Sequence, residues 1–206
     1  MASSSSGFKK EISDFKRRRI REETTNLFYV HGYAGTTIDA IANRLDVTKP
    51  FIYSYYKNKN ELLFDICRTG ISLALDVMDR VCALQHSPAD KLKLVSAKVL
   101  RMIVDYQEYI VVYEREEKSL EVGQAREIRD KRKLFDHRLA DILQQGHDQG
   151  QFDITDPVLT ATTIAGMMTW VSFWYSPNGK RSDTEIIAHT LSMIDTFIKH
   201  VELPRH

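Results

Sequence analysis

Residues 46–59, DVTKPFIYSYYKNK, bring phenol hydroxyls and lysine ammonium groups together within a short stretch of chain. Hydroxyl and ammonium donors are groups with which proteins contact the phosphates of nucleic acids. We expect Tyr53 and Tyr55 to offer hydroxyls to phosphates. Lys57 and Lys59 flank the start of a following helix, whose free amides also suit an anion. The chemistry that this stretch favours is therefore the binding of a polyanion.

A proline stands inside the same stretch, which must be helical if its aromatic side chains are to share a surface. With Thr48 as the N-cap, Pro50 falls in the first turn, where an amide hydrogen has no acceptor within the helix and its loss costs nothing. This placement exposes Thr48, Lys49 and Phe51 at the N-terminal end of the helix, the part of a recognition helix that reaches base edges. Tyr56 is expected in the core.

The elements that would position these groups are helices. A stripe of residues at helical spacing predicts a first helix that Gly32 stops, and Thr37 is placed to cap a second, short helix that runs to Leu45. A break of three residues then leads into the helix that contains the proline. Two short helices joined this tightly suggest a helix-turn-helix. The stripe of the first helix consists of Ile20, Thr24, Leu27, Phe28 and His31.

Helical periodicity continues through the rest of the chain, so we predict an all-α protein of about nine helices. Residues 1–60 would form a three-helix, helix-turn-helix DNA-binding domain with a basic N-terminal arm. Residues 61–206 would form a second, helical domain. The further predicted helices span residues 60–84, 88–106, 107–120, 123–149, 157–175 and 183–201.

Charge is distributed unevenly along the chain, although the formal net charge is only +1. Residues 1–62 hold 11 Lys or Arg against 7 Asp or Glu, so the remainder carries a net negative charge. A basic front end favours a polyanionic partner, and residues 17–19, all arginine, would strengthen such binding without reading sequence. The serine-rich start lacks the apolar run of a signal peptide, and no stretch approaches the roughly 18 apolar residues that span a bilayer. We therefore expect a cytoplasmic location and no membrane partner.

The segment TTIDAIANRLDVTKPFIYSYYKNKNELL resembles the helix-turn-helix signature of the TetR family of bacterial transcriptional repressors. The resemblance covers about 45 residues, and it includes the threonine that opens the second helix and the K-x-K-x-x-L run that begins the fourth. In this chain Pro50 stands where the family usually has glycine, and Phe51 replaces a small or polar residue. Both departures alter the edge that reads bases, where Phe51 can pack on a thymine methyl group.

The resemblance implies that residues 61–206 form a helical effector-binding and dimerisation domain. It also implies a set of DNA contacts. It implies contacts to the DNA backbone from Thr37, Tyr55, Lys57 and Lys59, and base-edge or groove contacts from Thr48, Lys49, Pro50, Phe51, Tyr53 and Ser54. Tyrosines at such positions also occur as ordinary packing residues, which is the alternative reading of the aromatic run.

Large apolar side chains on four predicted helices can line a cavity for a small hydrophobic effector. The same residue types also build ordinary cores, so the two readings compete at each position. Arg138, on the predicted inner face of its helix, could supply a cation there, with Arg132 or Lys133 nearby. The apolar candidates are Met102, Ile103, Tyr106, Tyr109, Tyr113, Phe135, Met167, Trp170 and Trp174.

The segment TTIAGMMTWVSFWYSPNGKRSDTEI resembles the branch of the TetR family that responds to fatty acyl-CoA or related thioesters. The match is a G-x-x-x-W-x-x-x-W-Y-x-P-x-G pattern. It implies an acyl-CoA effector, whose acyl chain needs an apolar slot and whose phosphates need cations.

The last predicted helix begins with SDTE, residues 182–185, which has the form of a capping box. Its apolar stripe is spaced like a heptad seam, and the preceding helix is apolar nearly all round, so that it must be buried on both sides. We therefore predict that both helices pair with their copies in a symmetric four-helix interface, whereas an ordinary core pair is the alternative. Such a homodimer would address two half-sites of a palindromic operator about 34 Å apart, or a multiple of that. The stripe consists of Ile187, Leu191, Ile194, Ile198 and Val201.

Enzyme and redox functions are the alternatives to a regulator. The sequence contains no Gly-rich phosphate loop, His-Glu-x-x-His pair, Cys-x-x-Cys pair or Gly-x-Ser-x-Gly elbow, so we expect no catalysis and no cofactor. The pair His137 and Asp141, four residues apart, could ligate a metal, although surface pairing explains it more simply. A redox sensor that uses Cys67 or Cys82 is a further alternative, but neither cysteine has an activating basic cluster in the sequence.

Overall fold

The computed structural model describes residues 2–199, and all regular structure in that range is helical, which confirms the all-α prediction. Val201, the last member of the predicted seam, lies outside the described residues. The described elements are α1 (Ala2–Gly35), α2 (Ile38–Arg44), α3 (Lys49–Tyr53), α4 (Lys59–Cys82), α5 (Pro88–Asp105), α6 (Gln107–Glu116), the 3₁₀ turn η1 (Glu117–Ser119), α7 (Val122–Asp148), α8 (Pro157–Trp174) and α9 (Asp183–Lys199).

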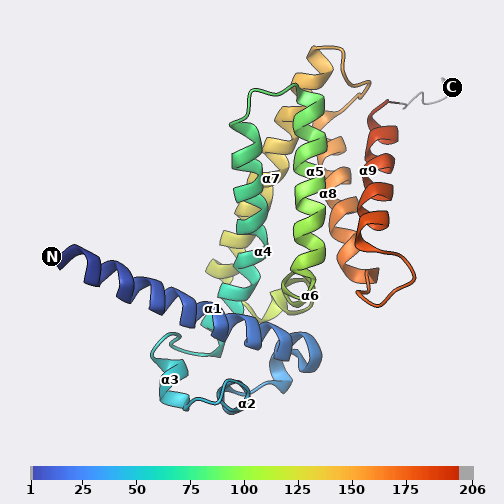
Figure 1. The fold of residues 1–206 in the computed structure, drawn as a ribbon. Coiled ribbons are helices and arrows are strands. Elements are labelled where there is room, and N and C mark those ends of the chain that lie inside the picture. The colour runs from blue at the N-terminus through green and yellow to red at the C-terminus, as the bar shows by residue number, and fades with distance from the viewer. Residues whose placement is uncertain (1, 200–206) are drawn as a thin grey trace.

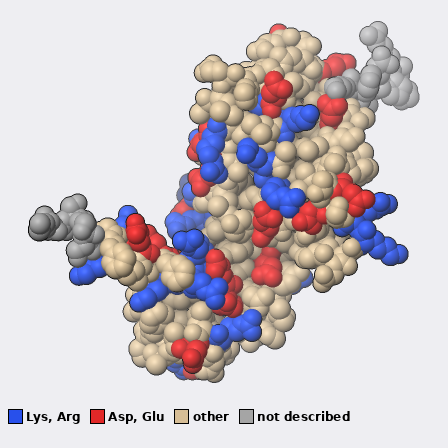
Figure 2. Space-filling view, in the orientation of Figure 1, with Lys and Arg blue, Asp and Glu red and all other residues tan. Residues whose placement is uncertain are grey.

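Helix α1 is longer than the sequence predicted. The basic segment expected as an arm before the first helix is itself helical, and α1 projects from the body of the molecule at its N-terminal end (Figure 1). The helix breaks at Gly32, whose φ of 74° is open to glycine but strained for other residues, so the predicted stop falls at the right position. Figure 2 shows lysine and arginine side chains along α1, interspersed with acids.

The helix-turn-helix forms through local capping. Thr37 is the N-cap of α2, and its hydroxyl accepts a hydrogen bond of 3.1 Å from the amide of Ala40. Asp46 carries the turn at a φ of 54°, a conformation that aspartate tolerates better than most residues. Thr48 is the N-cap of α3 and Pro50 lies in the first helical turn, as predicted, but the Thr48 hydroxyl makes no capping bond.

Helices α1 to α3 and the start of α4 form a small head with its own core. The fully buried Tyr56 belongs to that core, which confirms its inward orientation. Asn58 caps α4, because its side-chain oxygen accepts a 2.8 Å hydrogen bond from the amide of Glu61. Helix α4 then runs from the head into the body (Figure 1). The other core residues of the head are Ile20, Ile41, Ala42, Ile52 and Leu62.

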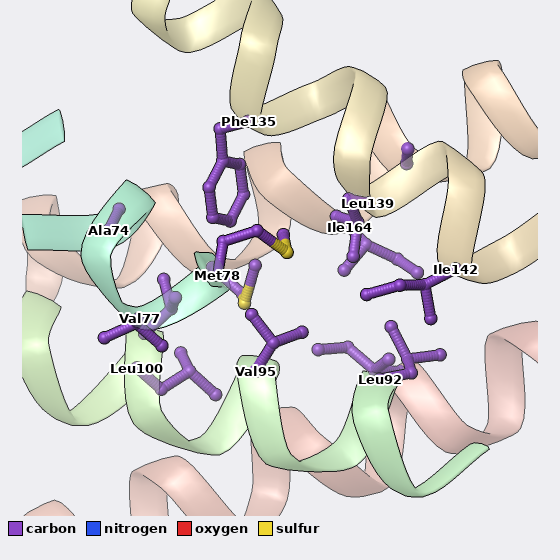
Figure 3. Close-up of a cluster of buried hydrophobic side chains, with 14 of the residues drawn as sticks. Ala74, Val77, Met78, Leu92, Val95, Leu100, Phe135, Leu139, Ile142 and Ile164 are labelled. Atoms are coloured by element: carbon purple, nitrogen blue, oxygen red, sulfur yellow. The ribbon is translucent and has the colours of Figure 1, made fainter. Parts of the chain in front are cut away.

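The body is a bundle of α4, α5, α7, α8 and α9, whose core is the largest in the molecule. Figure 3 shows Met78 of α4, Val95 of α5, Leu139 of α7 and Ile164 of α8 converging there. Burial of such side chains, worth about 1.5–3 kcal/mol each, holds the bundle together.

Helix α6 connects the body to the head. It packs against α1, and its last turn carries Glu116, whose carboxylate accepts a 3.0 Å hydrogen bond from the amide of Tyr33. Arg115 donates to the carbonyl oxygen of Tyr29 over 3.2 Å. Phe28 of α1 and Tyr109 of α6 share a second hydrophobic cluster. These contacts join α6 to α1.

Helices α8 and α9 close one side of the bundle (Figure 1). In the single chain one side of α8 carries exposed apolar residues, so the predicted burial on both sides requires a partner and stays a prediction. The predicted seam on α9 also differs: Ile194 and Ile198 are buried in the chain's own core. Ile187 and Leu191 pack against that core. In the single chain the described residues of the α9 stripe therefore pack on the bundle core, as the alternative of an ordinary core pair expects, and Ile187 and Leu191 stay partly exposed.

Candidate DNA interface and effector pocket

The outer surface of α3 presents the polar groups that the sequence singled out. Thr48, Pro50 and Ser54 are exposed, and Tyr53 is 51% exposed. The Ser54 hydroxyl donates to the carbonyl oxygen of Phe51 over 2.7 Å, so it is occupied within the helix end.

Phe51 and Tyr55 are less available than expected. Both are half-buried against the core of the head, and their ring centroids lie 5.3 Å apart. The ammonium group of Lys16, from α1, lies 5.7 Å from the Phe51 ring centroid. Lys16, in the basic segment expected as an arm, therefore lies beside α3.

The predicted lysines differ in their environment. The ammonium group of Lys49 lies 2.7 Å from a carboxylate oxygen of Asp39 on α2. Lys57 is exposed. The ammonium group of Lys59 donates 2.8 Å hydrogen bonds to the carbonyl oxygens of Tyr33 and Thr36, so this lysine ties α4 to the end of α1. Exposed Thr37 lies beside that junction.

A cavity of about 410 Å³ opens between α6 and four helices of the body, α4, α5, α7 and α8. Its wall is mainly apolar, with a few polar groups, which is the usual make-up of a small-molecule site. It is lined by Cys67, Gly70, Ile71 and Ala74 of α4, Val99, Met102 and Ile103 of α5, Tyr109, Ile110, Tyr113 and Glu114 of α6, Ile128, Arg132, Phe135 and Asp136 of α7, and Thr162, Ala165, Gly166, Met168, Thr169, Trp170 and Phe173 of α8.

The structure brings most of the predicted pocket residues together and leaves four outside the wall. Tyr106 is 40% exposed and packs edge-on against Tyr109. Arg138 pairs with Asp79 on the neighbouring helix. The predicted residues in the wall are Met102, Ile103, Tyr109, Tyr113, Phe135 and Trp170, and those outside it are Tyr106, Arg138, Met167 and Trp174.

The wall that α4 contributes was missed. Its four residues are spaced at i, i+3, i+4 and i+7, so they form one face of the helix, but that face contains small residues and a cysteine. A prediction based on large aromatic and apolar side chains does not select such residues. Small residues leave space, and the cavity exists partly because Gly70 and Ala74 do not fill it.

Two acids and one base, Glu114, Asp136 and Arg132, lie in the cavity wall. Arg132 lies 3.0 Å from a carboxylate oxygen of Glu114 and 5.2 Å from the Tyr113 ring centroid. Burial opposes the charge on Arg132, but hydrogen bonds with Tyr113 and Glu114 raise its pKa above the usual value. Burial raises the pKa of Asp136. The cavity thus offers a paired cation and one further acid to orient a ligand.

A second polar cluster lies where head and body meet. Asp65 of α4, only 5% exposed, accepts a 2.6 Å hydrogen bond from the phenol of Tyr56. Arg17, Arg21 and Arg68 each place a guanidinium nitrogen 3.5 Å from its carboxylate. The members of this cluster lie on three separate segments of the chain, so no sequence pattern indicates it.

The sequence left a metal-dependent enzyme and a redox sensor as alternatives to a regulator, and each can be compared with the described residues. Within residues 2–199 no group of three or more His, Cys, Asp or Glu side chains could hold a metal ion. Burial strongly raises the pKa of the Cys67 thiol, which opposes formation of a reactive thiolate. No helix in this part of the chain is long and apolar enough to cross a membrane.

Comparison with known proteins agrees with this arrangement. HTH-type transcriptional regulator YfiR of Bacillus subtilis (strain 168) is 28% identical over 159 residues, which cover 73% of this chain and 75% of YfiR. The structure of PfmR from Thermus thermophilus superposes with a TM-score of 0.81 at 22% identity, covering 90% of this chain and all of PfmR. AibR, solved in complex with isovaleryl coenzyme A and operator DNA, gives a TM-score of 0.77 at 26% identity, with 86% and 97% covered.

Two family models cover most of the chain. Residues 20–66 match the model of bacterial regulatory proteins of the tetR family, which spans the helix-turn-helix and the start of α4. Residues 85–196 match the model of the tetracyclin repressor-like C-terminal domain, which spans α5 to α9. Regulators of this family bind operator DNA and dimerise. The chain belongs to the TetR family of transcriptional regulators.

Proposed function

We propose that the protein is a homodimeric repressor that leaves its operator when a small hydrophobic effector enters the cavity of the body. The observation that carries this proposal is the position of α6. This helix contributes four residues to the cavity wall and also packs against α1 of the head. An effector that binds one position of α6 more tightly than another would favour that position and so shift the head. To weaken DNA binding tenfold, its binding free energies for the two positions must differ by about 1.4 kcal/mol. The protein would act in the cytoplasm.

Two observations favour a second copy as the occupant of the exposed face of α8. A regulator with a single helix-turn-helix gains specificity by presenting two of them, and exposed apolar patches of this kind mark interaction sites. On α8, Leu159, Trp170 and Trp174 lie at helical spacing and are each more than half exposed. Met193 adds an exposed apolar residue on α9. We therefore propose that these residues form the interface between the two subunits.

An acyl-CoA thioester is the specific effector that the comparison with AibR favours. The apolar cavity suits an acyl chain. The cation expected for the phosphates, Arg138, is paired with Asp79, and Arg132 is paired with Glu114. An acyl-CoA would have to displace one of these pairs or place its phosphates outside the cavity, whereas a free apolar molecule would not.

DNA binding is tested with the promoter beside the protein's own gene, by fluorescence anisotropy at several salt concentrations. We expect sequence-preferring binding that Tyr53→Ala weakens about tenfold, a loss of about 1.4 kcal/mol. Lys57→Ala should weaken binding to all sequences and lower the salt slope by about one, because it removes a phosphate contact. Lys93→Ala, an exposed lysine of α5, is the matched control. Wild-type protein without any sequence preference would refute the function itself.

Effector binding is tested by thermal shift, because a ligand that binds only the folded state raises the melting temperature. The compounds are isovaleryl-CoA, free coenzyme A and free isovaleric acid. A shift with the thioester alone, followed by DNA release, supports the acyl-CoA proposal. A shift with free coenzyme A alone would contradict an apolar acyl slot.

A further inference from the structure

We propose that Glu116, the last residue of α6, transmits the state of the cavity to the helix-turn-helix by holding the segment in which α1 ends. We call this segment, residues 33–36, the terminal turn. Glu116 is a positioning residue, because it lies neither in the cavity wall nor on α3. This role deepens the proposed function and rests on it.

Glu116 is connected to the cavity wall through the helix that carries it. It lies two residues after Glu114 and three after Tyr113, both of which line the cavity. All three residues belong to α6, where backbone hydrogen bonds fix neighbouring turns to one another. A shift of this part of the wall therefore carries Glu116 with it.

Two contacts of α6 lie on either side of the kink in α1. Before the kink, Arg115 donates a 3.2 Å hydrogen bond to the carbonyl oxygen of Tyr29. After it, the amide of Tyr33 donates a 3.0 Å hydrogen bond to Oε1 of Glu116. The kink is at Gly32, where an added Cβ would lie 3.5 Å from the same Oε1. The carboxylate of Glu116 therefore lies against the point at which α1 can bend.

The terminal turn leads directly into the helix-turn-helix, because the next residue, Thr37, is the N-cap of α2. From the other side Lys59, the first residue of α4, donates 2.8 Å hydrogen bonds to the carbonyl oxygens of Tyr33 and Thr36. An anion from α6 and a cation from α4 thus hold the turn through charge-assisted bonds. When α6 moves relative to α4, the turn follows Glu116 or loses it, and in both cases the support of α2 changes.

The chain offers two matched controls. Glu117 is an acid directly after α6, but it pairs with Arg129 of α7 over 3.2 Å and has no hydrogen bond to α1 among the described residues. Glu117→Ala therefore removes the same charge without touching the terminal turn. Glu116→Gln removes the charge of Glu116 but keeps an acceptor oxygen for the amide of Tyr33. Together these variants separate the hydrogen bond from any effect of charge on DNA binding.

The cavity can be perturbed without a ligand. Gly70 of α4 lines it, and a Cβ added there would lie 3.7 Å from Cγ1 of Ile110 on α6. Gly70→Leu extends beyond that contact, so it fills part of the cavity and presses on α6. Ile110→Trp enlarges the facing side chain of α6, and it replaces Gly70→Leu if that variant does not unfold cooperatively.

The first test is hydrogen exchange of the Tyr33 amide, which needs neither DNA nor effector. Relative to the amides of α5, exchange should be about tenfold faster in Glu116→Ala, and within about twofold of wild type in Glu116→Gln and Glu117→Ala. Gly70→Leu should make it about threefold faster, because it displaces α6. Unchanged exchange in Glu116→Ala or in Gly70→Leu, or equally fast exchange in Glu117→Ala, would overturn the role of Glu116.

The second test is a set of double-mutant cycles on affinity for the promoter DNA. Gly70→Leu should weaken binding about tenfold in the wild-type and Glu117→Ala backgrounds, but less than about threefold in Glu116→Ala, where the tie is already gone. The same loss in all three backgrounds, or no loss in any, would overturn the role of Glu116. Wild-type protein without any preference for a DNA sequence would refute the proposed function, whereas the exchange rates would still decide whether Glu116 holds the terminal turn.

Discussion

At the scale of single residues, Asp65 is a buried acid that lies among one phenol and three guanidinium groups. Burial alone would raise the pKa of its carboxyl. The hydrogen bond from Tyr56 and the charges of Arg21, Arg17 and Arg68 outweigh burial and lower that pKa below its usual value. The folded state therefore binds a proton at Asp65 less readily than the unfolded chain does.

This pKa shift predicts an acid-dependent stability. A lowered folded-state pKa adds stability above the unfolded value of about 4, and that stability is lost as pH falls through the folded-state pKa. The difference in free energy of unfolding between wild type and Asp65→Asn should be constant near neutral pH and shrink below about pH 4. Urea unfolding at several pH values measures it. Asp141→Asn, at an exposed position of α7, should show no such trend; a constant difference for Asp65→Asn would contradict the pKa shift.

The sequence predicted residue positions better than residue partners. Thr37, Thr48 and Pro50 occupy the predicted places because capping and proline rules act within one turn. Lys59 is bound to two carbonyl oxygens of a segment more than twenty residues earlier in the chain, and Arg138 is paired with an acid of another helix. Such partners depend on tertiary packing, which periodicity does not encode.

At the scale of elements, the end of α7 shows how closely the body is packed. Gly150 follows the helix at a φ of 67°, near the predicted stop. The chain then turns back so that the amides of Gln151 and Phe152 both point to the carbonyl oxygen of Gly146. The buried Phe152 ring lies directly over Gly146, where a Cβ would overlap it.

Because of that contact, we expect glycine-to-alanine substitutions at two positions of α7 to have opposite effects on the stability of the protein. Gly146→Ala should destabilise the protein by about 1–3 kcal/mol, because the Phe152 ring must move out of a packed core. Gly123→Ala, in the first turn of α7 with no heavy atom within 4 Å of the added Cβ, should be neutral or stabilising by up to about 1 kcal/mol. Chemical denaturation of both variants measures the two changes. Equal effects would show that the ring accommodates a methyl group.

The starts and ends of most helices could be predicted from the sequence, but which face of each helix is buried could not. The caps at Asn58, Ser87 and Asp156 mark helix starts because their side chains accept bonds from amides two or three residues later. Which face of a helix meets a neighbour depends on the whole bundle. The apolar stripe of α9 has the spacing of a dimer seam, but the same spacing also suits a helix that packs on its own core. In the single chain, the stripe packs on the bundle core.

At the scale of the whole molecule, dimerisation through α8 can be tested without DNA. Trp174→Glu should weaken self-association at least 30-fold, a loss of about 2 kcal/mol, because it places a charge in the proposed seam. Trp174 does not line the cavity, so the cavity should be preserved. Val122→Glu, at the highly exposed start of α7, is the control. Sedimentation equilibrium measures the association, and an unaffected dimer would place the seam elsewhere.

The position of Trp170 has a practical consequence. The chain contains two tryptophans, and both lie on the exposed side of α8, one of them also in the cavity wall. Indole emission from the unlabelled protein therefore arises entirely from this one helix. A spectral shift on dilution would monitor the separation of subunits, and quenching on titration with a small molecule would monitor occupancy, in the same cuvette.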